Sequence, residues 1–187
     1  AKATPQSVEE SAVAGRLDLR DKVVITIDGA SSKDLDDAVS LERDGLGRWV
    51  LGVHIADVSH YVRPGSALDL EAWERGTSVY FADQVVPMLP RELSNGICSL
   101  NPRVDRLALS CVMTLTPEGE VVDHTIAKSV IRTTERMTYE DCNALLAHSD
   151  PALAERYARI LPMLEDMAAL SRVLEGRRRR RGALELD

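Results

Sequence analysis

Four aspartates lie within a span of ten residues, at the end of a run whose side chains alternate in character. Residues 22–28 alternate in the manner of a half-buried β-strand, with Val23, Ile25 and Ile27 on one side. The small and polar residues 29–32 form a turn, which lets the later aspartates fold back toward the end of the strand. The chain must therefore build a sheet beside a loop of concentrated negative charge. The four aspartates are Asp28, Asp34, Asp36 and Asp37.

Carboxylates this close repel one another, so some of them must be protonated or neutralised near neutral pH. Hard divalent cations bind through oxygen, and Mg²⁺ keeps several water molecules and accepts phosphate oxygens as further ligands. We therefore interpret Asp28, Asp34, Asp36 and Asp37 as a metal site for phosphate chemistry, with Mg²⁺ as the expected ion and Mn²⁺ as an alternative.

The acidic stretch is compatible with other kinds of site to different degrees. Asp, Ser and Gly are common turn residues, so the stretch is also compatible with an ordinary loop. A calcium-binding EF-hand is disfavoured, because the required Gly and the closing Glu are not at their offsets from Asp34. A phosphotransferase with an aspartate nucleophile is conceivable, but Ala30 stands where such enzymes usually carry a second Asp.

Composition limits the class of protein. The 187 residues suit one domain or part of a larger one, and 44% apolar with 28% charged residues excludes a disordered chain. No apolar run reaches membrane-spanning length, and the three cysteines are far apart and without metal-ligand spacing. We therefore expect a cytoplasmic protein without a membrane partner. The net charge of −7 counts against a general nucleic-acid binder, although metal ions would offset part of it.

Hydrophobic periodicity predicts a mixture of strands and helices. Two hairpins are expected, the first turning at 44–47 and the second at 117–120, and Leu68, Leu70 and Trp73 are expected on or near the inner face of a helix. Residues 182–187 are predicted to begin a further strand. The predicted strands are 22–28, 38–43, 48–56, 107–116 and 121–132, and the predicted helices are a short one with a capping box at Ser7 and Glu10, then 66–75, 138–147 and 151–175.

Several motifs, in the same order along the chain, resemble the catalytic (RNB) domain of the ribonuclease II and ribonuclease R family. Their sequences are closer to those of ribonuclease R. The resemblance spans about residue 14 to the end, so residues 1–13 are interpreted as a linker or extension and 14–187 as the N-terminal half of the domain. The motifs are TIDGASSKDLDDA (26–38), VHIADVSHYV (53–62), RGTSVY (75–80), VPMLPRELS (86–94), CSLNP (98–102) and RRGALELD (180–187).

The resemblance implies an α+β fold of RNB type, for which we expect an antiparallel, barrel-like sheet in 22–132 surrounded by helices. It also implies a Mg²⁺-dependent hydrolytic exoribonuclease that digests single-stranded RNA from 3′ to 5′ and releases nucleoside 5′-monophosphates. The four aspartates fall on the family's metal-associated positions, with two ions expected and Asp36 most closely tied to catalysis. Tyr80 and Tyr139 match aromatic residues that stack on RNA bases.

A complete RNB domain is longer than this chain. We therefore expect a C-terminal half, together with cold-shock and S1-type domains, in a parent protein, and little or no nuclease activity from these residues alone. The alternatives are a non-catalytic RNA-binding module of the same fold, or a metal-dependent phosphodiesterase acting on small substrates.

A few polar residues near the motifs are expected to have mainly structural roles. His54 and His60 are expected to be structural, and Asp57 to end a strand, with support of the metal-binding carboxylates as its alternative role. Arg91 and Glu92 are expected to approach RNA or one another, while the arginines at 177–181 are expected to form a solvated helix end.

Overall fold

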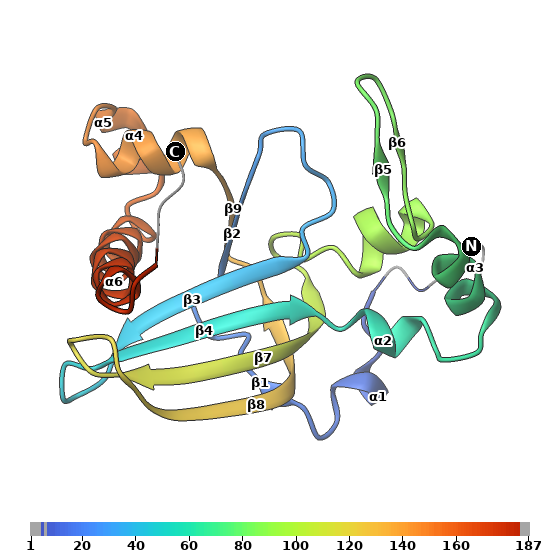
Figure 1. Ribbon diagram of the computed structural model, residues 1–187, viewed down its shortest axis with the longest axis horizontal. Helices are drawn as coiled ribbons and strands as arrows, with labels where there is room; N and C mark the ends of the chain where they lie inside the picture. The colour runs from blue at the N-terminus through green and yellow to red at the C-terminus, as the bar shows by residue number, and fades with distance from the viewer. Residues whose placement is uncertain (1–4, 6, 184–187) are drawn as a thin grey trace.

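A strongly curved sheet of seven strands forms the centre of the computed structural model, which describes residues 5 and 7–183 (Figure 1). The strand order is β1-β8-β7-β4-β3-β2-β9, and a separate two-stranded hairpin, β5-β6, stands apart from it. The strands are β1 (Leu17–Asp18), β2 (Ile25–Asp28), β3 (Asp37–Arg43), β4 (Trp49–Ala56), β5 (Val79–Tyr80), β6 (Val85–Val86), β7 (Asp105–Leu115), β8 (Val121–Arg132) and β9 (Glu135–Thr138).

The two predicted hairpins of the large sheet are confirmed. Strands β3 and β4 pair antiparallel, as do β7 and β8. At the first turn, the Asp44 carboxylate accepts hydrogen bonds from the backbone N–H groups of Leu46 and Arg48, each at 2.9 Å. Gly47 takes a left-handed φ of 73°, which a side chain would strain.

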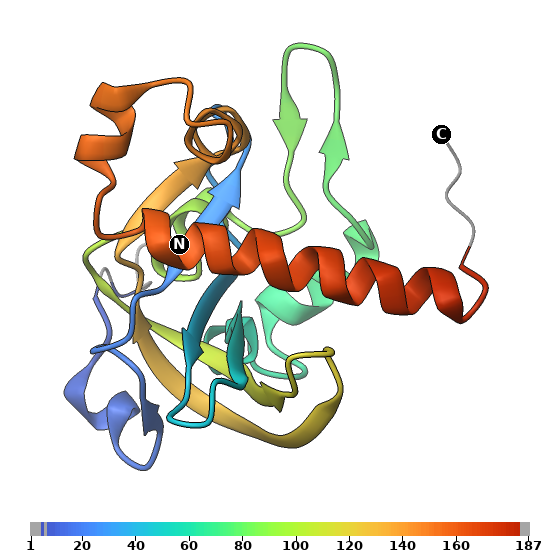
Figure 2. The same cartoon turned by 90° about the vertical axis from the view of Figure 1, so that its left-hand side faces the viewer.

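The edge strands of the sheet differ from the expected antiparallel, barrel-like arrangement. Strand β1 pairs parallel to β8, and β9 pairs parallel to β2, so the sheet is mixed and extends beyond residues 22–132. Among the described residues no ladder joins β1 to β9, so the sheet is open. The α+β class is confirmed, with the helices gathered around the curved sheet (Figures 1 and 2).

Helices α3, α4 and α5 begin at side-chain caps that the sequence carries. Ser66 accepts from the Asp69 N–H at the start of α3, Thr138 from the Asp141 N–H at the start of α4, and Asp150 caps α5. The helices are α1 (Glu10–Val13), α2 (Val58–Tyr61), α3 (Ala67–Arg75), α4 (Tyr139–Leu146), α5 (Pro151–Arg156) and α6 (Leu161–Arg180), with a kinked helical segment, η1, at Glu92–Ile97.

Three helix predictions are wrong in part. The single helix expected at 151–175 is two helices, because the intervening Tyr157 and Ile160 are buried in the core rather than continuing the turn. On α3, Leu70 is 59% exposed and Trp73 is 86% exposed, so neither faces inward. At α1 the Ser7 capping box does not form, because Glu9 is the residue that precedes the helix.

Strand β2 is buried on both faces, which fixes the end that carries Asp28. Ile25 belongs to a core cluster with residues of α4 and α6, whereas Val24, just before the strand, belongs to a second cluster with Leu35 and Ala38. Val23 and Ile27 pack against the first cluster, as the alternating pattern predicts. The acidic loop therefore starts from a rigid strand.

A chain of polar side chains crosses the buried face of the sheet. His54 Nδ1 lies 2.7 Å from the Ser110 hydroxyl, and its Nε2 lies 3.1 Å from the Ser40 hydroxyl. Ser110 continues the chain to Ser129. A Cβ atom at Gly52 would collide with Ser40 and His54, so this strand position has to be glycine. The structural role expected for His54 is thereby confirmed.

Burial lowers the pKa of His54 to about 4, from 6.5, which predicts acid sensitivity. Between pH 6.5 and pH 4, His54 is protonated in the unfolded chain but stays neutral in the folded chain. Its protonation therefore lowers the free energy of unfolding by about 1.4 kcal/mol for each pH unit below 6.5, down to pH 4. Urea unfolding at pH 7, 6 and 5 is expected to show a steeper loss for the native protein than for His54→Gln. Equal slopes for the two proteins would contradict the prediction.

The strand expected to begin at 182–187 lies largely outside the described residues, which end at 183. In the part of the chain that the structure describes, no helix is both long and apolar enough to cross a membrane.

Candidate metal centre and RNA interface

The acidic loop joins the end of β2 to the start of β3, which places Asp28 and Asp37 at the same end of two neighbouring antiparallel strands (Figure 1). Leu35 is 1% exposed and anchors the loop in the core. Its neighbours Asp34 and Asp36 are half-buried and exposed respectively. Burial of a single leucine thus leaves the aspartates on either side of it accessible.

Contacts from another motif hold the second half of the loop. The hydroxyl of Ser99, which is fully buried, donates to the Lys33 carbonyl at 2.9 Å and accepts from the Leu35 N–H at 3.1 Å. The Leu35 carbonyl accepts from the Leu100 N–H, and the Asp36 carbonyl from the Ala56 N–H, each at 2.9 Å. The backbone that carries Asp34 and Asp36 is therefore fixed by β4 and by the segment after η1.

A single arginine holds the backbone of the first half of the acidic loop. Arg136, on β9, donates from Nη2 to the carbonyl oxygens of Gly29, Ala30 and Ser32, at 3.1, 2.9 and 2.8 Å. The acidic loop thus has a fixed backbone along most of its length before any ligand is considered.

Burial, followed by the charges of neighbouring aspartates, raises the pKa of two of the four carboxyl groups. For Asp36, burial is the largest cause, and the charges of Asp34, Asp37 and Asp28 add to it. For Asp28, burial again comes first and Asp37 raises the pKa further, while the charge of Arg136 lowers it. The four aspartates therefore share one electrostatic neighbourhood, in which a cation would be favoured.

The donor set suits a hard cation, because all four side chains offer carboxylate oxygen. Within the described residues, no group of three or more His, Cys, Asp and Glu side chains is arranged closely enough to hold a metal ion. In this part of the chain the four carboxylates are therefore not gathered into a metal cage. Mg²⁺ in proteins is usually held by one or two carboxylates and keeps water or phosphate oxygens as its other ligands.

Tyr80 lies against this acidic loop. It ends β5 in the hairpin that projects from the body of the protein beside the β2–β3 loop (Figures 1 and 2). Its hydroxyl donates to Asp34 Oδ2 at 3.4 Å, and the Asp34 charge, followed by burial, raises the pKa of Tyr80. The side chain is 68% exposed, and the adjacent Phe81 is 56% exposed, so aromatic surface is available next to the carboxylates.

Tyr139 lies at the same end of the sheet. It is the first residue of α4 and is 58% exposed. The preceding residue, Thr138, is the ladder partner of Asp28 in the parallel pairing of β9 with β2. The fold therefore brings both predicted RNA-stacking tyrosines to the region of the aspartates from separate parts of the sequence.

Residues 16–187 match the family model described as the RNB domain. The chain belongs to the RNB domain family. The match covers every strand of the large sheet, because even β1 begins after residue 16.

Proteins named Ribonuclease R are similar to this chain in sequence and in structure. The chain is 55% identical to Ribonuclease R 1 of Lactococcus lactis over 187 residues, which are 100% of this chain and 23% of that protein. It is similar, with a TM-score of 0.89 and 32% identity, to Mycoplasma genitalium RNase R in complex with double-stranded RNA, covering 100% of this chain and 33% of that one. The chain spans about a quarter of the length of the curated relatives it matches.

The same fold occurs in a protein described as a pseudonuclease. Yeast Ssd1 is similar with a TM-score of 0.78 and 21% identity, covering 94% of this chain and 21% of that one. At this identity the likeness concerns the fold alone.

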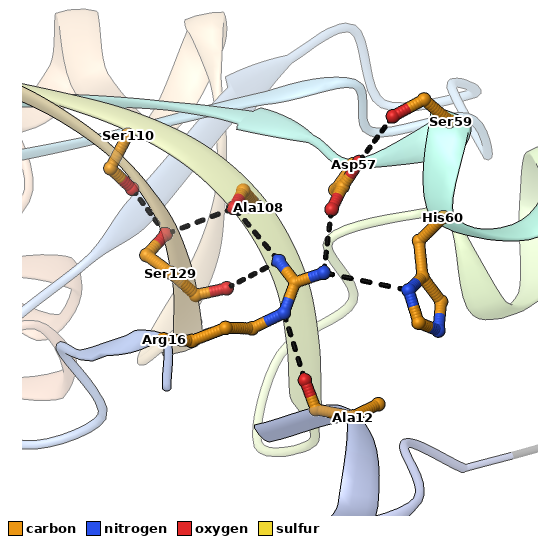
Figure 3. Close-up of polar contacts among 8 residues, drawn as sticks. All are labelled: Ala12, Arg16, Asp57, Ser59, His60, Ala108, Ser110 and Ser129. Atoms are coloured by element: carbon orange, nitrogen blue, oxygen red, sulfur yellow. Dashed lines mark hydrogen bonds and ion pairs between the residues drawn. The ribbon is translucent and has the colours of Figure 1, made fainter. Parts of the chain in front are cut away.

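Near the start of the RNB match, Arg16 anchors the N-terminal segment to the sheet (Figure 3). Its Nη2 forms an ion pair with Asp57 Oδ2 at 2.7 Å, and its Nη1 donates to the carbonyls of Ala108 and Ser129. Its Nε donates to the Ala12 carbonyl at 2.8 Å. Asp57, predicted to end a strand, is thus also one half of a buried ion pair.

The environment of Asp57 favours its charged form. Burial by itself would raise its pKa, but hydrogen bonds from Ser59 and Arg16 outweigh burial and lower it. His60 Nδ1 lies 3.5 Å from Arg16 Nη2, and burial together with the charge of Arg16 lowers the pKa of His60. Both residues of the motif at 53–62 therefore take part in a structural network of the RNB domain.

Two of the remaining candidates, Arg91 and Arg177, donate hydrogen bonds to the backbone of other segments. Arg91 donates to the Val85 carbonyl at 3.4 Å, which supports the β5-β6 hairpin. Arg177 contacts the Glu118 carbonyl and the Glu120 carboxylate at the β7-β8 turn. The arginine run forms the last turn of α6 and the residue after it, as predicted for a helix end.

Sequence reasoning missed Arg136 and Ser99 as residues that shape the RNB acidic loop. Ser99 lies inside the quoted motif at 98–102, which was a usable signal. Arg136 lies three positions before the predicted stacking residue Tyr139, but it acts on carbonyls more than a hundred positions earlier. Only the parallel pairing of β9 with β2 places it there.

Proposed function

We propose that the chain is part of the catalytic domain of a Mg²⁺-dependent exoribonuclease that hydrolyses single-stranded RNA from 3′ to 5′ and releases nucleoside 5′-monophosphates. The observation that carries the proposal is the hydrogen bond between Tyr80 and Asp34, because it joins an exposed aromatic residue to a cluster of four interacting aspartates. Family membership and the named Ribonuclease R relatives support it.

In this proposal Asp28, Asp34, Asp36 and Asp37 would hold up to two Mg²⁺ ions, or Mn²⁺ ions. When bound, such ions make water more acidic and stabilise the charge on the leaving oxygen of a phosphodiester. The carboxylates would fix the positions of the ions and of the water molecules that the ions carry. Asp36 is exposed and has a raised pKa, which suits it to orient the attacking water and accept its hydrogen bond.

The two tyrosines would receive the 3′ end of the RNA. Base stacking on an aromatic ring tolerates any sequence, as an enzyme that removes successive nucleotides requires. Tyr80 would stack a base while its hydroxyl remains at Asp34, and Tyr139 would contact a neighbouring nucleotide from the start of α4.

Tyr80→Ala is expected to weaken binding of single-stranded RNA by about 1–3 kcal/mol, since a stacking ring is lost. Tyr80→Phe is the matched control, because it keeps the ring and removes only the hydroxyl that contacts Asp34. Fluorescence anisotropy of a labelled oligonucleotide measures both. Equal weakening by the two variants would mean that the hydroxyl, rather than stacking, supplies the affinity.

The longer proteins to which the chain is similar suggest that further segments complete the site. We propose that a C-terminal part of the RNB domain, with cold-shock and S1-type domains, accompanies this chain in a cytoplasmic parent protein. The 187 residues alone are expected to bind metal weakly and to turn over little or no RNA. Substantial turnover by them would contradict this part of the proposal.

The test follows 5′-labelled single-stranded RNA on a denaturing gel, with Mg²⁺ or EDTA, for the chain and for a longer polypeptide with a complete RNB domain. A ladder that shortens from the 3′ end only with Mg²⁺, and 5′-monophosphate products, are expected from the longer polypeptide. Binding without cleavage would instead indicate a non-catalytic RNA-binding module. Cleavage of a small phosphodiester but not of RNA would indicate a phosphodiesterase.

A further inference from the structure

The guanidinium of Arg136 occupies the inner side of the acidic loop. The residue is half-buried and pairs with Thr26 in the parallel ladder, so its backbone is held one strand away from Asp28. A single Nη2 atom carries two hydrogens and serves three carbonyl oxygens, so at least one hydrogen is shared. This arrangement draws the carbonyls of residues 29, 30 and 32 toward one cation.

The contacts of Arg136 are with the backbone of the loop and not with its carboxylates. Among the described residues, none of the ion pairs joins Arg136 to an aspartate. Hydrogen bonds from a charged donor are stronger than those from a neutral one, so they resist rearrangement of the loop. Residues 29–32 form most of the connection between Asp28 and Asp34, so their conformation sets how far apart these two side chains lie.

We propose that Arg136 is a positioning residue, which holds the first half of the acidic loop in the conformation that lets Asp28 and Asp34 bind a divalent cation together. This inference rests on the proposed metal-dependent function. Arg136 itself touches neither the metal nor RNA. Its role parallels that of Ser99 in the second half of the loop, but it depends on a charged group from a strand far away in the sequence.

The charge and the hydrogen bonds of Arg136 have opposite effects on metal affinity. A positive charge near the site repels a cation, so removal of the charge alone would strengthen metal binding. Loss of the three hydrogen bonds would loosen the loop and weaken metal binding. The sign of the change therefore separates a positioning role from a purely electrostatic one.

The experiment titrates a polypeptide that contains the complete RNB domain with Mn²⁺, because the 187 residues alone are expected to bind metal weakly, and follows free Mn²⁺ by electron paramagnetic resonance. Arg136→Met is expected to weaken Mn²⁺ binding by about 10-fold or more, the usual effect of losing a group that orients metal ligands. Arg136→Lys is expected to recover part of the affinity. Arg132→Met is the matched control, because Arg132 is an exposed arginine of β8 that pairs with Asp105. Unchanged or tighter binding by folded Arg136→Met would overturn the proposal.

Hydrogen exchange in the metal-free chain gives an independent readout. Amides of residues 30–33 are expected to exchange faster in Arg136→Met and Arg136→Lys, with no change in Arg132→Met, whereas the Leu35 amide stays bonded to Ser99. Unchanged exchange in this loop would overturn the positioning role even if the melting temperature falls. If the native chain binds Mn²⁺ no better than Asp28→Asn, the proposed metal site fails, and the exchange rates still decide whether Arg136 positions the loop.

Discussion

Asp36→Asn is expected to reduce the kcat for RNA hydrolysis by about 100-fold or more in a polypeptide that contains the complete RNB domain. Loss of a carboxylate that orients the attacking water and a metal ligand removes about 3 kcal/mol or more of transition-state stabilisation. Asp36 reaches solvent, although the surrounding protein desolvates its carboxyl group enough to raise its pKa, so the isosteric amide fits without repacking. Single-turnover cleavage of labelled RNA measures the effect, because it isolates chemistry from product release.

Stability provides the internal control for this variant. The pKa of Asp36 is raised by burial and by Asp34, Asp37 and Asp28, so its charge is unfavourable in the folded, metal-free chain. Asp36→Asn is therefore expected to keep or slightly raise the melting temperature while activity falls. Loss of activity together with unfolding would mean that Asp36 is structural. A variant with near-native kcat would remove Asp36 from the catalytic group.

Arg16→Met is expected to lower the free energy of unfolding by about 3–5 kcal/mol, because it leaves the buried carboxylate of Asp57 without its partner. The side chains of Arg16 and Asp57 are only 7% and 4% exposed, and Arg16 also binds three backbone carbonyls, as Figure 3 shows. Urea unfolding measures the loss. This is a large share of the stability of a domain of ordinary size.

Two further variants test the physical reason. Arg132→Met breaks a more exposed ion pair with Asp105 and is expected to cost less than about 1 kcal/mol. The double change Arg16→Met with Asp57→Leu removes both charges, and it is expected to recover part of the stability lost in Arg16→Met. If Arg16→Met costs no more than Arg132→Met, the buried pair does not anchor the N-terminal segment.

Local patterns were sufficient for much of the fold. The alternation in β2 predicted which side chains face each core cluster, and Val23, Ile25 and Ile27 do share one of them. Ser66 and Thr138 cap helices close to the predicted starts, since capping depends on residues three positions apart. The local pattern failed where tertiary packing determines which face of a helix is buried. Trp73 on α3, for example, was expected on or near the inner face but is exposed.

The sequence by itself determined the acidic character of the loop, the hairpins on either side of it and, through its motifs, the RNB family. These depend on residue types at short spacing. Only the tertiary structure decided how the loop is held, because Arg136 and Ser99 reach it from β9 and from the segment after η1. It also decided that the sheet stays open and that Tyr80 meets Asp34. Contacts between distant segments follow from strand pairing and core packing, which no local spacing encodes.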